Sequence, residues 1–122
     1  MRKKPDWLGE TKGQRSQRVG KRGEKRALAE LKAEPVARSG AGRTKGDGRK
    51  RVRDHTLHIE HKTTEAGSFS ITRYIRSKLL REAGSKQLPF LSITFVRPRK
   101  EEIWVAMPLW VLSTLLGEEV DL

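Results

Sequence analysis

The spacing of apolar positions predicts helices and strands in alternation along the chain. Residues 55–62 alternate strictly between two sets of side chains, which is the pattern of a half-buried strand. Residues 88–96, LPFLSITFV, form a largely apolar run typical of a buried strand, and residues 103–107 form a second. The alternation places two sets on opposite faces of the first strand: Leu57, Ile59 and His61, and His58, Glu60 and Lys62.

Three further segments have helical periodicity. Residues 16–34 predict a helix with a narrow apolar stripe, with Ser16 as its N-cap and Pro35 as its stop. Residues 71–83 and 109–116 predict two shorter helices, and each is followed by a glycine, as helix C-termini commonly are.

The segment between the first helix and the alternating strand lacks such periodicity. Residues 35–38 could form a short strand. Residues 39–50 hold four glycines and no aliphatic side chain larger than that of Ala, which predicts a loop or hairpin with Asp47-Gly48 as its turn. The resulting order of elements is helix–strand–strand–helix–strand–strand–helix, which indicates one α/β layered domain.

Length and composition narrow the class of protein. With 122 residues the chain is sized for one domain, and the absence of cysteine excludes disulfides, zinc sites built from thiolates and thiol catalysis. No apolar run approaches the roughly 20 residues that span a bilayer. The basic N-terminus lacks the apolar stretch of a signal peptide. We therefore expect an intracellular, soluble protein of the cytoplasm or nucleoid.

Positive charge is concentrated in the first half of the chain. Residues 1–53 carry 18 Lys and Arg against 6 Asp and Glu, whereas residues 54–122 carry 9 of each, so the first half holds the whole net charge of +12. This asymmetry indicates a polyanionic partner, because each phosphate neutralised by Lys or Arg releases condensed counterions. Residues 1–15 predict a flexible basic arm ahead of a domain over residues 16–122. A basic nucleic-acid-binding protein without chemistry would share this charge.

Asp47 and the strand residues Glu60, His61 and Lys62 are candidates for metal-dependent hydrolysis of a phosphodiester. Mg²⁺ takes oxygen ligands, commonly one or two carboxylates with water and phosphate completing the octahedron. The strand period puts Glu60 and Lys62 on one face, about 7 Å apart along the backbone. The carboxylate can then hold the ion while the ammonium positions the nucleophile or offsets phosphate charge. Asp47 can approach from a neighbouring strand as a second ligand, and the His61 backbone carbonyl is a candidate third oxygen.

The tripeptide Glu-x-Lys carries little information alone, because it occurs at residues 10–12, 30–32 and 60–62. The first lies in the predicted arm, and the second lies on the predicted helix, where positions i and i+2 do not share a face. Only the third falls in an alternating segment that an acidic residue on a glycine turn precedes. This context selects Glu60 and Lys62.

Several segments together resemble the archaeal-type Holliday junction resolvases, a branch of the PD-(D/E)xK nuclease superfamily. Residues 22–28 (RGEKRAL) are similar to the first helix of that family with its glutamate, and residues 36–42 (VARSGAG) resemble its Arg-Ser and small-residue loop. Residues 45–48 (KGDG) stand where the family has its metal-binding aspartate. Residues 57–64 (LHIEHKTT) resemble its strand with Glu-x-Lys and a trailing Thr. Residues 89–95 fit a later core strand, so the likeness runs through most of the chain in the family's order.

The resemblance implies a restriction-endonuclease-like fold, with a central mixed sheet flanked by helices, and a catalytic metal site. Asp47 and Glu60 would hold Mg²⁺, for which Mn²⁺ would substitute. Lys62 would be the catalytic lysine, and Glu24 would approach the metal from the first helix. One departure is Lys25, where the family usually has Arg, because Lys keeps the charge but loses bidentate phosphate geometry.

The resemblance also implies contacts to the DNA backbone near the scissile phosphate, made by Arg38 and Ser39. The basic run at residues 49–53 lies beside the candidate site, which favours further phosphate contacts over a merely solvated hairpin. The full set of expected DNA-binding residues is Lys25, Arg26, Arg38, Ser39, Arg43, Lys45, Arg49 and Arg51.

Each candidate also has a purely structural interpretation. Glu24 could be a solvated helix residue and Asp47 an ordinary turn residue. Glu60 and Lys62 could form an ion pair on an edge strand, worth under ~1 kcal/mol if exposed. The three histidines of the alternating strand are spaced by three residues, which puts neighbours on opposite faces and argues against a shared zinc ion.

We expect a magnesium-dependent endonuclease that resolves four-way DNA junctions as a homodimer. A junction has two-fold symmetry, and paired incisions in opposing strands need two identical sites, which a C2 dimer supplies. The expected dimer surface is the apolar C-terminal half, above all Trp104, Leu109, Trp110 and the helix over 71–83. The rival hypotheses are another PD-(D/E)xK nuclease of nicking, repair or restriction type, a non-catalytic basic nucleic-acid-binding protein, and a ribosome-associated protein that prefers RNA.

Overall fold

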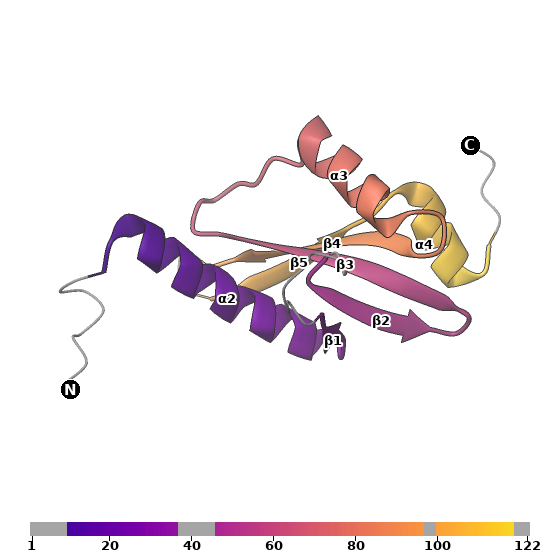
Figure 1. Ribbon diagram of the computed structural model, residues 1–122, viewed down its shortest axis with the longest axis horizontal. Coiled ribbons are helices and arrows are strands. Elements are labelled where there is room, and N and C mark those ends of the chain that lie inside the picture. The colour runs from indigo at the N-terminus through magenta and orange to yellow at the C-terminus, as the bar shows by residue number, and fades with distance from the viewer. Residues whose placement is uncertain (1–9, 37–45, 97–99, 119–122) are drawn as a thin grey trace.

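The computed structural model describes residues 10–36, 46–96 and 100–118, which form an α/β domain of one five-stranded mixed sheet and three helices (Figure 1). The elements in chain order are α2 (Lys12–Glu30), β1 (Glu34–Pro35), β2 (Gly48–Val52), β3 (His55–Thr64), α3 (Arg73–Ala83), β4 (Leu88–Phe95), β5 (Glu102–Ala106) and α4 (Leu109–Leu116). Strand order follows the chain, β1-β2-β3-β4-β5. Only β3 and β4 are parallel, and α3 supplies the crossover that a parallel pair needs.

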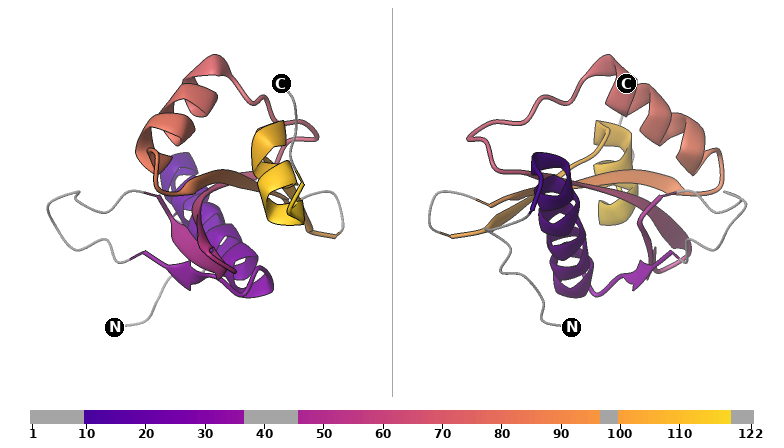
Figure 2. Two further views of the ribbon diagram at one scale, coloured as in Figure 1. Left: turned by 90° about the vertical axis from the view of Figure 1, so that its right-hand side faces the viewer. Right: turned by 60° about the vertical axis from the view of Figure 1, so that its left-hand side comes forward.

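The helices cover both faces of the sheet, with α2 and α3 on opposite sides (Figure 2). The cluster under α2 also takes in α4, and its buried members are Leu28, Leu57, Ile59, Leu88, Phe90 and Val111. The cluster under α3 is smaller and consists of Leu79, Leu91 and Ile93. The predicted α/β class, with a mixed sheet flanked by helices, is confirmed at this level.

The alternating strand is confirmed as β3, and its two faces meet different helices. Ile59 packs into the cluster that contains Leu28 of α2. Glu60 and Lys62 line a small hollow with residues of α3. β3 is also the central strand of the sheet, between β2 and β4. Its polar face is therefore held between a helix and rigid neighbouring strands, which is a suitable place for a chemical site.

The first helix begins earlier than predicted, because Thr11 rather than Ser16 is its N-cap. The Thr11 hydroxyl accepts the Gln14 N–H at 3.0 Å, and the Gln14 side chain accepts the Thr11 N–H at 2.9 Å. This capping box satisfies two otherwise unpaired donors, which Ser16 alone cannot match. Residues 12–15 of the predicted arm are therefore helical, and the helix ends at Glu30, four residues before the predicted end at residue 34.

The predicted turn at Asp47-Gly48 is wrong, because Gly48 begins β2. The hairpin between β2 and β3 turns instead at residues 53–54, and Arg53 has a positive φ of 56° there. Position 48 requires glycine because of packing: a Cβ here would lie 2.5 Å from Cδ2 of Leu28. The glycine thus allows α2 to approach the sheet closely, a need that sequence alone cannot distinguish from a turn.

The other predicted elements are confirmed with small boundary shifts. The predicted helix over 71–83 begins at Arg73, with Thr72 as N-cap, and closes at Gly84. The predicted helix over 109–116 matches α4, and Gly117 ends it in the left-handed conformation with φ 74°. The strand predicted over residues 88–96 matches β4 and is buried. The strand predicted over residues 103–107 matches β5, but its predicted burial is wrong, because β5 is an edge strand on which Trp104 and Val105 are exposed. No helix in the described part of the chain is both long and apolar enough to cross a bilayer.

Two glycines of α2 provide a matched test of how closely this helix packs. A Cβ at Gly20 would meet nothing within 4 Å, whereas a Cβ at Gly23 would overlap the Thr63 side chain of β3. We expect Gly20→Ala to raise the free energy of unfolding by ~0.5–1 kcal/mol, through lower backbone entropy in the unfolded chain. We expect Gly23→Ala to lower it by ~1–3 kcal/mol through overpacking. Urea unfolding measures both, and equal gains from the two variants would contradict the packing of α2 against β3.

Candidate metal centre

Asp47 is hydrogen-bonded to the two residues of β3 that flank Glu60, namely Ile59 and His61. Its buried carboxylate accepts the backbone N–H of His61 at 2.7 Å, and its own N–H donates to the carbonyl of Ile59 at 2.9 Å. These two bonds fix the end of the glycine-rich segment against the strand. Asp47 and Glu60, 13 positions apart in the sequence, are thereby linked through the two neighbours of Glu60 in β3.

Burial and the charge of Asp47 both act on Glu60. The Glu60 side chain is 17% exposed. Burial raises the pKa of Glu60, the charge of Asp47 raises it further, and the ammonium groups of Lys62 and Lys78 oppose the rise. The Lys62 nitrogen lies 3.9 Å from a Glu60 oxygen, so the two predicted catalytic side chains meet on one face of the strand. A half-buried carboxylate beside a second carboxylate is an environment that favours a bound divalent cation.

His61 has a structural role on the opposite face of β3. Its Nδ1 lies 2.6 Å from the Ser92 hydroxyl, and its Nε2 lies 3.0 Å from Thr63 Oγ1 and 3.2 Å from Thr94 Oγ1. Burial lowers the pKa of His61 to about 4, so the ring is neutral near neutral pH. The imidazole is thus a polar member of the core, held by three hydroxyls. The predicted use of the His61 backbone carbonyl as a metal ligand stays a prediction.

Glu24 lies on the side of the sheet that α2 covers. It is half-buried and lines a hollow between α2 and residues 33–36, together with Lys21 and Lys25. The hollow reaches the Asp47 end of the site, because Val36 lines it and donates its N–H to the Asp47 carbonyl at 3.0 Å. The ligand atoms gathered around Glu60 do not include the Glu24 carboxylate. Its approach to a metal ion stays a prediction.

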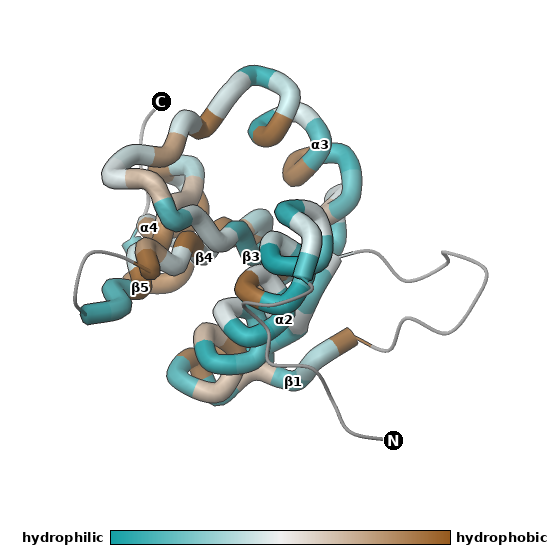
Figure 3. Tube along the Cα trace, turned by 90° about the vertical axis from the view of Figure 1, so that its left-hand side faces the viewer, coloured by the Kyte–Doolittle hydropathy of each residue, from teal (hydrophilic) through white to brown (hydrophobic). Residues whose placement is uncertain are grey.

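The predicted DNA-binding residues fall into three groups. Lys25 and Arg51 are exposed, and Figure 3 shows α2 as hydrophilic over most of its length. Arg26 is exposed but forms an ion pair with Glu101, just before β5, and Arg49 is half-buried and donates to the Gly48 carbonyl. The remaining four lie outside the described residues: Arg38, Ser39, Arg43 and Lys45.

Two residues that the sequence did not single out, His58 and Glu82, join Glu60 in one group. One nitrogen of His58 and one carboxylate oxygen from each of Glu60 and Glu82 all lie within 4.8 Å of one another. The strand alternation carried a signal for His58, which precedes Glu60 by two positions on the same face. Glu82 lies on α3, and only the packing of that helix over β3 brings it to the site. No local pattern could have identified it.

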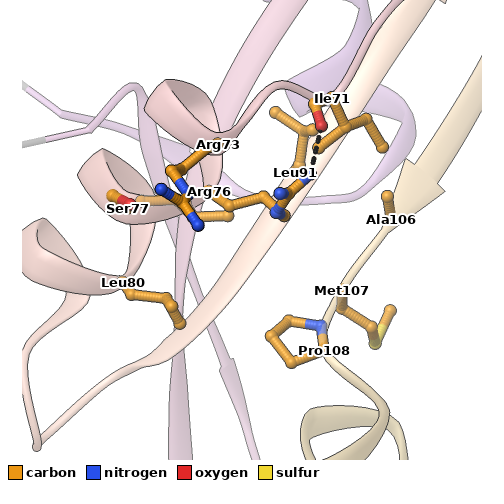
Figure 4. A pocket seen from close by; sticks show the side chains of 10 residues that line it. Ile71, Arg73, Arg76, Ser77, Leu80, Leu91, Ala106, Met107 and Pro108 are labelled. Carbon is orange, nitrogen blue, oxygen red and sulfur yellow. Dashed lines mark hydrogen bonds between the residues drawn. The ribbon is translucent and has the colours of Figure 1, made fainter.

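A larger hollow lies on the other flank of α3, away from Glu60 (Figure 4). Its volume is about 490 Å³, and it lies between α3 and the connection from β5 to α4. Leu80, Leu91, Met107 and Pro108 make its wall apolar. Arg76 also borders it and donates to the carbonyl of Ile71. It offers apolar surface and no carboxylate, so it is not a second metal centre.

Comparison with known proteins adds no family assignment: no protein-family model matches the chain, and no curated protein matches it.

Proposed function

We propose that this protein is a metal-dependent endodeoxyribonuclease that cleaves four-way DNA junctions. The observation that carries the proposal is the double attachment of Asp47 to β3 around Glu60, with Lys62 on the same face as Glu60. Two adjacent carboxylates and an ammonium are the groups that metal-dependent phosphodiester hydrolysis requires. The order of helices and strands in a mixed sheet agrees with the architecture that the family resemblance implies.

Asp47 and Glu60 are the residues that would hold Mg²⁺ or Mn²⁺. The donor set fits such an ion: both groups are carboxylates, and burial, followed by the charge of Asp47, raises the pKa of Glu60, a cost that a bound cation would relieve. A bound divalent ion supplies a polarised phosphate and a more acidic attacking water. Lys62, with its side chain 35% exposed, can reach a phosphate outside the sheet and offset the charge that develops there.

The charge distribution supports DNA as the substrate. The net charge of +12 comes entirely from residues 1–53. This part of the chain includes α2, whose exposed residues include Arg22 and Lys25, and the strand residue Arg51. Contacts from these side chains would be to phosphates, so they contribute affinity and position rather than base specificity.

A homodimer is the expected form, because a junction presents two symmetry-related scissile phosphates. Support comes from apolar side chains that are exposed on β5 and α4, where Trp104 is 59% and Leu109 is 58% exposed. Trp110 is also exposed, and so are Tyr74 and Leu80 on α3. Burial of this surface between two copies would remove it from water, which a stable dimer needs.

The test uses a supercoiled plasmid that extrudes a cruciform, with a plasmid that lacks the inverted repeat as control. A dimer that makes paired cuts within the lifetime of one complex converts the cruciform plasmid to linear DNA in Mg²⁺ and leaves the control plasmid supercoiled. Nicked product from both plasmids would indicate the nicking or repair type of nuclease. Binding without any cut in Mg²⁺ or Mn²⁺ would overturn the enzymatic proposal and favour the non-catalytic basic protein.

A further inference from the structure

His58 is the least explained polar side chain in the described part of the chain. It is fully buried, yet neither ring nitrogen has a hydrogen-bond partner. Gln87 lies near the ring, outside hydrogen-bond geometry. A buried polar group that is left unpaired costs about 1–3 kcal/mol, so proteins rarely keep one without a function. An aliphatic or aromatic residue would fill the same space without that cost.

The surroundings of His58 are those of a metal ligand. One of its ring nitrogens lies within 4.8 Å of a carboxylate oxygen of both Glu60 and Glu82, and those two oxygens are equally close to each other. A space of about 20 Å³ between β3 and α3 adjoins two members of the group: Glu60 and Glu82 line it together with Lys62 and Lys78, and His58 does not.

We propose that His58, Glu60 and Glu82 form a binding site for one divalent transition-metal ion, with an imidazole nitrogen and two carboxylates as ligands. The nitrogen ligand determines the class of ion. Mg²⁺ prefers an all-oxygen shell, whereas Mn²⁺ and Zn²⁺ accept a mixed set of imidazole and carboxylates. We therefore expect this site to bind Mn²⁺ more tightly than Mg²⁺, and Zn²⁺ more tightly than Mn²⁺.

This site is distinct from the Asp47 position in the proposed nuclease centre, although the two share Glu60. Asp47 is not a member of the group, and its carboxylate is engaged by the His61 N–H. A shared carboxylate can bridge two ions, so the two positions are compatible. The inference goes beyond the proposed function and does not depend on it, because ion binding can be measured without DNA.

The test is a titration of the metal-free protein with Mn²⁺, followed by the loss of the electron paramagnetic resonance signal of free Mn²⁺. Wild type is compared with Glu82→Gln and with His58→Phe, which keeps a ring but has no ligand atom. Glu102→Gln, an exposed carboxylate on β5, is the control for the change of charge. We expect each ligand variant to weaken Mn²⁺ binding at least about tenfold. We expect the control to bind as wild type does, and we expect Mg²⁺ to displace Mn²⁺ poorly from wild type.

Thermal unfolding without metal verifies that each variant is folded. If His58→Phe is not folded, the comparison of wild type with Glu82→Gln decides the test. Equal Mn²⁺ affinity in wild type and Glu82→Gln would overturn the proposed site. If Asp47→Asn were the only variant to lose Mn²⁺ binding, the proposed site would also be overturned, and the ion would be assigned to the nuclease centre. Binding that depends on His58 and Glu82, in a protein that cuts no DNA, would uphold the site and reject the nuclease.

Discussion

Glu60→Gln is expected to reduce metal-dependent cleavage of a four-way junction by about a thousandfold or more, equivalent to ~4 kcal/mol of lost transition-state stabilisation. The amide has the shape of the carboxylate but no charge, so it holds a divalent ion poorly. Junction binding should be unaffected, because phosphate contacts come from Lys and Arg side chains elsewhere. Single-turnover cleavage and a band-shift titration measure the two quantities separately.

The same substitution should raise thermal stability in the absence of metal, which excludes unfolding as the cause of lost cleavage. Burial and Asp47 raise the pKa of Glu60 in the folded state above its unfolded value. Such a group destabilises the folded state increasingly as pH rises from the unfolded pKa through the folded one, so at pH 7 the neutral amide removes a cost. Glu102→Gln is the matched control for charge. Cleavage by Glu60→Gln at the wild-type rate would contradict the role of Glu60.

Acid should destabilise the protein through its buried histidines, and this is the second large effect that we expect. Burial lowers the pKa of His61 to about 4 from the ordinary 6.5. The unfolded chain therefore binds a proton between these two values that the folded chain does not, so stability is lost as pH falls through this window. A difference of about 2.5 pKa units corresponds to at most ~3 kcal/mol. His58, whose pKa burial also lowers, adds to the loss in the same direction.

Urea unfolding at pH 7, 5.5 and 4.5 measures this effect in wild type and in His61→Gln. The Gln variant is expected to be less stable than wild type at pH 7, because it cannot meet all three hydroxyls around the ring, but to lose less stability on acidification. The opposing contribution of Glu60 is present in both proteins and cancels in the comparison. Parallel pH profiles for the two proteins would contradict a buried, neutral His61.

The elements that were predicted well are those that a local pattern defines. The alternation over residues 55–62 determined both the strand and its two faces, because a shift of one position would exchange the apolar and polar sets between them. The apolar run over residues 88–96 contains β4, and it is apolar at most positions because the side chains of this strand are buried on both faces of the sheet.

One incorrect prediction concerns a residue whose role depends on a distant partner. Gly48 is a packing glycine because Leu28 lies against it, and nothing nearby in the sequence distinguishes that need from a turn. The predicted N-terminus of α2 is wrong for a local reason, because the reciprocal Thr11–Gln14 cap lies in a charged segment that has no apolar periodicity. The DNA contact of Arg26 stays a prediction, whereas its ion pair with Glu101, 75 positions along the chain, is a tertiary contact that no local pattern indicates.

The candidate site was predictable only in part for the same reason. Asp47, Glu60 and Lys62 could be selected by spacing and by family resemblance, and the structure brings them together. Glu82 was beyond prediction, because its position over Glu60 depends on where α3 packs across the sheet. His58 lay on the correct face but was disregarded, because burial and the absence of a hydrogen-bond partner are properties that only a folded chain has.

The measurement that tests the central claim most directly is the cleavage of an end-labelled synthetic four-way junction by the wild-type protein. A linear duplex of matched sequence is the parallel substrate, and each is incubated with Mg²⁺, with Mn²⁺ or with EDTA. The account predicts paired cuts in opposing strands of the junction, only when metal is present, and little or no cutting of the duplex. An intact junction in both metals, at protein concentrations that bind it fully, would contradict the account.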